Sequence, residues 1–185
     1  MFAISFQSYD SPSTPPLPLL RLNNSRAFST LGIDNFGPLQ VKEVYGRKKV
    51  FKAWGVLYTC ASSRAILLDL CFDMSENSFI KSFSRFISRR GAPDHVISDN
   101  GSNFASKEVQ LYSTERNIKW HFNLPVAPWH GGFFERLIRI IKDMLKKQLK
   151  NALLTYEELH TVFLQVERIV NNRPITYVYP TDIES

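Results

Sequence analysis

The chain of 185 residues is long enough for one well-buried domain and too short for two generous ones. Its hydrophobic fraction of 44% and aromatic fraction of 13% exclude a disordered tail, and no apolar run reaches the roughly 18 residues of a membrane span. The net charge of +6 favours a polyanionic partner, although charge alone does not identify one. These features predict an intracellular protein that does not enter membranes.

The first half of the chain is predicted to be a lead-in followed by β-strands. Residues 1–26 are rich in Ser, Pro and Asn, which is typical of a linker. Strand patterns then cover Phe28–Val41, interrupted or ended near Gly37–Pro38, followed by Val50–Cys60 and Arg64–Phe72. Because the loops between these strands are short, the sequence predicts an antiparallel meander.

A helix follows, with Ser75 as its N-cap and a stop signal at Arg89–Pro93. Its apolar residues recur at helical spacing: Phe79, Phe83, Phe86 and Ile87. The elements predicted after it are a strand to about Ser98, a helix over 103–116, a strand over Ile118–Leu124 and a helix over Phe133–Lys150. Strands separated by helices favour parallel crossovers, so the sequence predicts a mixed α/β sheet of five strands, three antiparallel and two parallel, flanked by helices.

The last predicted helix begins at a capping box, Thr155–Glu158. Its predicted apolar stripe comprises Leu159, Val162, Phe163, Val166, Ile169 and Val170. It ends near Asn171–Pro174.

The positions of the cysteines and histidines indicate neither a disulfide nor a structural zinc site. Cys60 and Cys71 lie in apolar, strand-like runs and are predicted to be buried, reduced thiols, with a disulfide as the less favoured alternative. The four histidines are scattered, with no Cys or His at zinc-finger spacing, so no structural zinc is expected.

Three acidic residues stand where a metal-binding carboxylate would be useful. Asp34 ends a strand-like stretch, and Asp99 closes the apolar run His95–Ser98. Glu135, separated from Asp99 by 35 residues, lies in the first turn of a basic amphipathic helix. Taken singly, each reads as a surface acid or turn former. Carboxylates on two strand ends and a helix can also close around divalent cations, as phosphodiester chemistry requires.

The segments that carry these acids resemble the catalytic core of retroviral and retrotransposon integrases, within the ribonuclease-H-like fold. They are Gly32–Leu39, Ile97–Phe104 and Ala127–Arg136, and the resemblance runs from about Phe28 to the end of the chain. The residue sequence of the third segment, together with Leu153–Leu159 and Asn172–Thr176, looks most like the BEL/Pao class of long-terminal-repeat retrotransposons.

The resemblance implies a first strand lying parallel beside the fourth, which would bring Asp34 and Asp99 together facing Glu135. Carboxyl ends of parallel strands are also where open sheets place ligands. The family's chemistry would then be DNA 3′-end cleavage and strand transfer by these three residues with two Mg²⁺ or Mn²⁺ ions. The implied partners are retroelement ends and target DNA in the nucleus, with a homodimer or higher oligomer as the assembly.

The residues assigned to DNA binding are Arg139, Lys142, Lys146, Asn100 and His130. Arg139 and Lys142 follow Glu135 by four and seven residues and so share its helix face. Residues at those offsets contact the DNA end in the family, whereas the default reading of such a run is a solvated face. Asn100 lies in the turn that presents Asp99, and His130 either touches DNA or packs its own loop.

Three other acidic residues lie near the candidate metal ligands in the sequence but are not expected to bind metal. Asp94 precedes the short strand and should sit at the end opposite Asp99. Asp69 lies inside a meander strand, and Asp143 lies two turns beyond Glu135.

The expected domain is an integrase catalytic core over residues 27–185, truncated at its C-terminal end and without the family's upstream zinc module. One alternative is a decayed retroelement relic that acts as a nucleic-acid-binding or assembly module. A ribonuclease H or another transposase on the same fold is a further rival, less favoured because the motifs are integrase-like.

Overall fold

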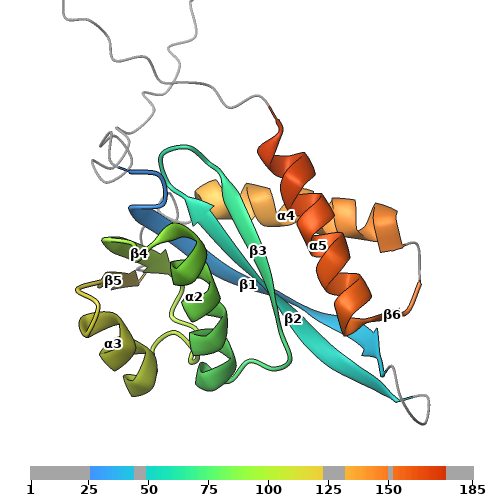
Figure 1. Ribbon diagram of the computed structural model, residues 1–185, viewed down its shortest axis with the longest axis horizontal. Helices are drawn as coiled ribbons and strands as arrows, with labels where there is room; N and C mark the ends of the chain where they lie inside the picture. The colour runs from blue at the N-terminus through green and yellow to red at the C-terminus, as the bar shows by residue number, and fades with distance from the viewer. Residues whose placement is uncertain (1–25, 44–48, 123–131, 150–151, 174–185) are drawn as a thin grey trace, which may run out of the picture.

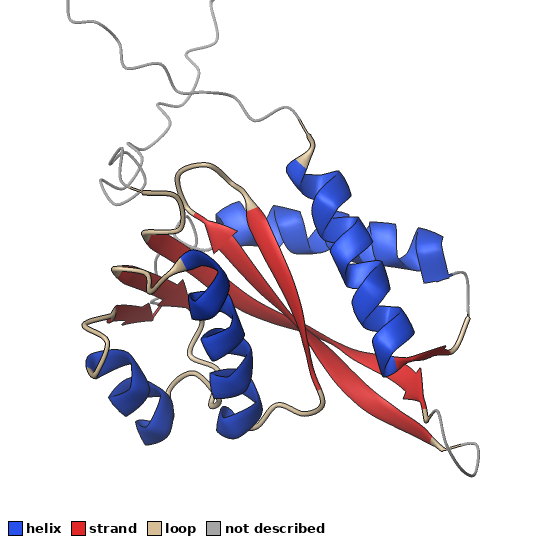
Figure 2. Ribbon diagram, viewed as in Figure 1, coloured by secondary structure: helices blue, strands red, loops and turns tan. Residues whose placement is uncertain are grey.

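The computed structural model describes residues 26–43, 49–122, 132–149 and 152–173, without the side chains of 132–135. A central sheet is covered by α2 and α3 on one face and by α4 and α5 on the other (Figures 1 and 2). The strands are β1 (Thr30–Lys42), β2 (Val50–Cys60), β3 (Ile66–Cys71), β4 (His95–Ser98), β5 (Lys119–Phe122) and β6 (Leu154–Thr155). The helices are α2 (Glu76–Arg90), α3 (Lys107–Thr114), α4 (Gly132–Leu149) and α5 (Tyr156–Asn171).

The strand order β3-β2-β1-β4-β5 confirms the predicted mixed sheet. β1, β2 and β3 form the antiparallel meander, whereas β4 runs parallel to both β1 and β5. The short β6 was not predicted. It pairs with the far end of β1, Val41 opposite Leu154, because β1 extends well beyond β4 and leaves an edge that the α4–α5 connection fills.

A β-bulge interrupts β1 at Gly37–Pro38 without ending the strand. Phe36 pairs with Gly55, and the next pair is Leu39 with Ala53, so two residues of β1 oppose one of β2. The extra residue changes which side chains point to which face. Phe36 and Leu39 therefore both reach the core under α4 and α5, although three positions separate them.

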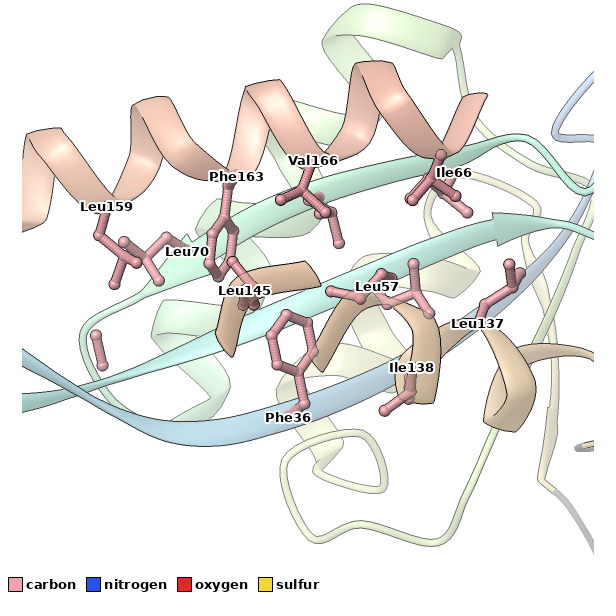
Figure 3. Close-up of a cluster of buried hydrophobic side chains, with 14 of the residues drawn as sticks. Phe36, Leu57, Ile66, Leu70, Leu137, Ile138, Leu145, Leu159, Phe163 and Val166 are labelled. Carbon is pink, nitrogen blue, oxygen red and sulfur yellow. The ribbon is translucent and has the colours of Figure 1, made fainter. Parts of the chain in front are cut away.

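Two apolar cores lie on opposite faces of the sheet. The core on the α2 side is rich in aromatic rings, with Tyr58 stacked on Phe86 at a centroid distance of 4.8 Å. In the core on the other side, Phe36 of β1 lies against Leu145 of α4 and Phe163 of α5 (Figure 3). The predicted stripe of α5 is correct except at Ile169. That side chain is 48% exposed because α5 buries only the narrower line through Leu159, Phe163, Val166 and Val170.

The helix ends follow the predicted caps. Ser75 accepts a hydrogen bond from the Ser78 amide at the start of α2, as expected. The prediction of a helix over 103–116 was too long, because α3 begins only after its own N-cap, Ser106, and ends at Thr114. Cys60 and Cys71 are buried and free, which confirms that prediction. No described helix is long and apolar enough to cross a membrane.

Side chains from the helices close the outer edge of β3. Oδ1 of the Asn171 side chain accepts from the Ile66 backbone N–H at 2.8 Å, and Nδ2 of the same side chain donates to the Ile66 carbonyl at 2.9 Å. Glu167 accepts from the Leu68 amide, and the Tyr156 hydroxyl donates to the Leu70 carbonyl. Burial raises the pKa of Tyr156 to about 12, so this donor keeps its proton at neutral pH. The edge strand is thereby satisfied without another strand.

The capping box of α5 predicts a specific acid sensitivity. The Thr155 amide donates to the Glu158 carboxylate at 2.7 Å and holds the pKa of Glu158 below its ordinary value of 4.5. The carboxylate therefore contributes stability that is complete above pH 4.5 and is lost as the pH falls through the lowered pKa. Glu158→Gln should flatten the acid limb of the free energy of unfolding, measured by urea titration at several pH values. The matched control is Glu157→Gln in the same turn, and an unchanged acid limb in Glu158→Gln would contradict the assignment.

Candidate active site

Asp99 directly follows the last residue of β4, as expected, whereas Asp34 lies inside β1 and not at a strand end, because β1 continues through the bulge to Lys42. The β1–β4 register pairs Gly32 with Ile97, and two further residues along each chain lead to Asp34 and Asp99. The register thus brings the two positions toward the same end of the β1–β4 pair. The parallel placement of β1 beside β4 that the resemblance implies is confirmed.

Asp34 belongs to the face of the sheet that α4 covers. Phe36 and Ile97 are buried in the core on that face, and successive residues of a strand alternate between faces. Asp34 lies two residues before Phe36 and therefore shares its face. Asp99 lies two residues after Ile97, in the turn that directly follows β4.

The helix that carries Glu135 packs over this same face. Leu137 and Ile138 of α4 belong to the core that contains Phe36 and Ile97, and Figure 3 shows Leu137 near Leu57 and Ile138 near Phe36. Glu135 is the fourth residue of α4, and its side chain lies outside the described residues. Among the side chains that are described, no group of three His, Cys, Asp or Glu gathers in a metal-binding arrangement.

The chain turns sharply after Asp99, and hydrogen bonds fix the turn. The Gly101 amide donates to Oδ1 of Asp99 at 3.1 Å, while the Gly101 carbonyl accepts from the Phe104 amide at 2.9 Å. A Cβ at position 101 would lie 2.9 Å from the Asn103 side-chain oxygen and 3.0 Å from Oδ1 of Asp99. Glycine therefore leaves room for these two side-chain oxygens, and a larger residue would displace them.

Two residues that sequence reasoning missed hold the backbone of Asp99. The Trp120 indole donates to the Ser98 hydroxyl at 2.9 Å, and that hydroxyl donates to the Asp99 carbonyl at 2.8 Å. Phe104 anchors the other side of the turn by packing edge-on against Phe79. This role of Trp120 depends on the β4–β5 register, which pairs Trp120 with Val96. No local feature of the sequence indicates that register.

The three acids that were not expected to bind metal either have structural partners or lie away from Asp34 and Asp99. Asp94 precedes β4 at the end opposite Asp99, as predicted. Its carboxylate accepts a hydrogen bond from the Ser29 hydroxyl at 2.5 Å, which was not predicted. Asp69 is buried on the α2 side, where its carboxylate accepts from the Arg85 guanidinium at 2.6 Å. Asp143 is exposed on α4, two turns beyond Glu135.

Basic side chains line the outer surface of α4. Arg139, Lys142 and Lys146 are all exposed. A groove of about 760 Å³ runs between the β1 bulge and the second half of α4, with Phe36 and Leu145 on its apolar wall and Lys142 and Lys146 on its rim. Asn100 is exposed beside Asp99, whereas His130 lies outside the described residues.

Comparison with solved structures identifies the fold as the ribonuclease-H-like fold of integrase catalytic cores. A simian T-cell lymphotropic virus intasome in complex with a PP2A regulatory subunit contains a similar chain, with a TM-score of 0.65 and 19% identity, covering 83% of this chain and 52% of that one. The magnesium complex of the HTLV-2 integrase catalytic core domain, in its dimeric form, has a TM-score of 0.62 and 23% identity, covering 83% and 93%.

Sequence comparisons agree with the fold. Residues 38–128, which include Asp99, match the integrase core domain family. A Gag-Pro-Pol polyprotein of Human T-cell leukemia virus 2 is 40% identical over 63 residues, which cover 34% of this chain and 4% of the polyprotein. A Gag-Pol polyprotein of Walleye dermal sarcoma virus is 26% identical over 174 residues, or 86% of this chain and 9% of the polyprotein. The chain thus spans a small part of these relatives, and the matches support an integrase catalytic core.

Proposed function

We propose that the chain is the catalytic core of a retroelement integrase that cleaves DNA 3′ ends and joins them to target DNA. The observation that supports this proposal is the β1–β4 register, in which Asp34 and Asp99 each follow a paired residue by two positions, with α4, the helix containing Glu135, packed over the sheet. The amino-acid sequence of residues 127–136 favours the BEL/Pao class of retroelement integrases.

The donor set fits hard divalent cations. Carboxylate oxygens are the ligands that Mg²⁺ and Mn²⁺ prefer, and carboxylates held close together repel one another unless cations offset their charge. Asp34, Asp99 and Glu135 would hold the ions. When bound, a pair of such ions activates a water or a DNA 3′-hydroxyl and stabilises the departing oxygen. The hydrogen-bonded turn at Gly101 and the Trp120–Ser98 pair keep Asp99 in position before any substrate arrives.

DNA is the proposed polyanionic partner, bound by Arg139, Lys142, Lys146, Asn100 and His130. The first three are exposed on α4, and Asn100 is exposed directly after Asp99. The related HTLV-2 integrase core is described in dimeric and trimeric forms, which supports an oligomer here as well. We place its action on DNA in the nucleus.

Removing two charges from α4 should change the salt dependence of DNA binding. Each phosphate contact contributes about 0.9 to the slope of log affinity against log salt, so Arg139→Ala with Lys142→Ala should reduce the slope by up to about 1.8. The loss should be similar for unrelated DNA sequences, because phosphate contacts carry no base information. Fluorescence anisotropy at four or five salt concentrations measures it.

The control for that experiment is Lys81→Ala with Lys107→Ala, which removes the same charge from exposed positions on α2 and α3. A slope that falls equally in both double variants, or in neither, would assign the α4 residues to an ordinary solvated surface.

The proposed activity is tested by reversal of a pre-formed branched DNA product in Mn²⁺. A single catalytic core needs only local alignment of one hydroxyl and one phosphate for this reaction, whereas paired-end insertion needs two spaced sites. We expect weak, metal-dependent turnover on the branched substrate and no concerted insertion. A folded, metal-binding chain without turnover would instead identify a relic that serves as a nucleic-acid-binding or assembly module.

A further inference from the structure

Two histidines meet on the strands next to the acidic pair. Nδ1 of His95 in β4 and Nε2 of His121 in β5 are 3.0 Å apart, with the ring centroids 5.2 Å apart. The register pairs Ile97 with His121, so the histidines are diagonal neighbours on parallel strands. His95 shares the strand face of Ile97, and Trp120 and Phe122 pack on the opposite face of β5. Both histidines therefore point to the same side of the sheet.

The separation of the two nitrogens matches that of two ligands on one metal ion. With metal–nitrogen bonds of about 2.05 Å, two ligand nitrogens are about 2.9 Å apart at a 90° angle and about 3.3 Å apart at a tetrahedral angle. The observed 3.0 Å lies between these values. The second torsion of a histidine side chain is broad, so modest ring rotations would turn both lone pairs toward a shared ion.

The surroundings leave the pair accessible. His121 is exposed and His95 is partly exposed, so water can complete the coordination of an ion held by two protein ligands. The cation nearest in register is Lys119, opposite His95, and its exposed side chain can keep its ammonium group in solvent. Asp94, the adjacent acid, accepts from Ser29.

We propose that His95 and His121 form a binding site for a borderline transition-metal ion such as Zn²⁺, Ni²⁺ or Cu²⁺. Imidazole ligands select these ions over Mg²⁺ and Mn²⁺, so the site is chemically distinct from the carboxylate pair. Bound metal would replace a hydrogen bond between β4 and β5 with two coordinate bonds and tie the two strands together. The proposal does not depend on DNA strand transfer.

The test is calorimetric titration of the full chain with Ni²⁺ in excess Mg²⁺, which occupies hard oxygen sites. The background variant carries His130→Gln and His160→Gln. Of the four histidines in the chain, only His95 and His121 then remain. We expect one Ni²⁺ to bind, with affinity falling in acid because protons compete for the nitrogens. Adding either His95→Gln or His121→Gln should weaken binding at least about tenfold, as loss of one of two ligands.

Circular dichroism of each variant confirms the fold, and the two single variants provide independent readings of the same site. In the background chain, Ni²⁺ should also raise the thermal unfolding midpoint, and this shift should vanish in both variants. Equal Ni²⁺ affinity with and without the pair, or no binding to the background chain, would overturn the proposal and leave the contact as a hydrogen bond between the two rings.

Discussion

Replacing Asp99 by Asn is expected to lower metal-dependent activity on branched DNA at least about 100-fold, the scale set by losing one preorganised charged group. Asn keeps an oxygen that can accept from the Gly101 amide, so the turn should survive while the negative ligand is lost. Removing one of two neighbouring carboxylates also relieves repulsion, so the metal-free protein should be at least as stable as the wild type. Turnover and urea unfolding measure the two effects.

The control is Asp94→Asn, five residues earlier. Asn at this position can still accept from the Ser29 hydroxyl, and the residue lies at the opposite end of β4. Its activity should remain near wild type. Retention of normal strand cleavage by Asp99→Asn, or an equal loss in both variants, would remove Asp99 from the proposed catalytic set.

Gly55→Ala should destabilise the protein even though alanine usually suits a strand better than glycine. The gain from a stiffer backbone is about 0.5–1 kcal/mol. A Cβ at position 55, however, would lie 2.2 Å from the Phe36 ring, which is itself buried and stacked on Phe163. Overpacking of this kind costs about 1–3 kcal/mol, so the steric term should exceed the backbone gain. Urea unfolding would show a lower midpoint with an unchanged slope.

A second substitution separates this steric cause from a general loss of strand stability. Phe36→Leu removes the ring edge that the new methyl group meets, so the two substitutions together should cost less than the sum of the single costs. Contacting residues show coupling of about 0.5–3 kcal/mol. Strict additivity, or a stabilised Gly55→Ala, would show that the Phe36 ring moves aside without cost.

Elements set by local chemistry could be predicted from the sequence. Ser75 and the Thr155–Glu158 box mark helix starts because a side chain caps its own first turn. The exceptions depend on distant partners. The bulge at Gly37–Pro38 preserves pairing with β2, and β6 exists only because β1 is longer than β4. Residue 104 was assigned to a helix but is buried at the turn after Asp99.

Some features of the candidate site could likewise be predicted from the sequence, whereas others depend on distant partners. The position of Asp99 at a strand end was visible in the sequence, whereas Asp34, also expected at a strand end, lies inside β1. The parallel pairing of their strands came from the resemblance and from the rule for parallel sheets. The Trp120–Ser98 hydrogen bond and the His95–His121 contact depend on the register of two four-residue strands. Such short strands carry too few side chains to fix a register from their sequence alone.

The way the β3 edge is closed has a consequence for synthesis of the protein. Ile66 and its partner Asn171 are 105 residues apart in the chain. At about 5–20 residues per second, a ribosome would add the closing helix roughly 5–20 s after it makes the strand. During that interval the outward amides and carbonyls of a nascent β3 have only water or a neighbouring chain to bond. Products released before α5 is complete would keep this edge open permanently, and self-association through β3 is their expected fate.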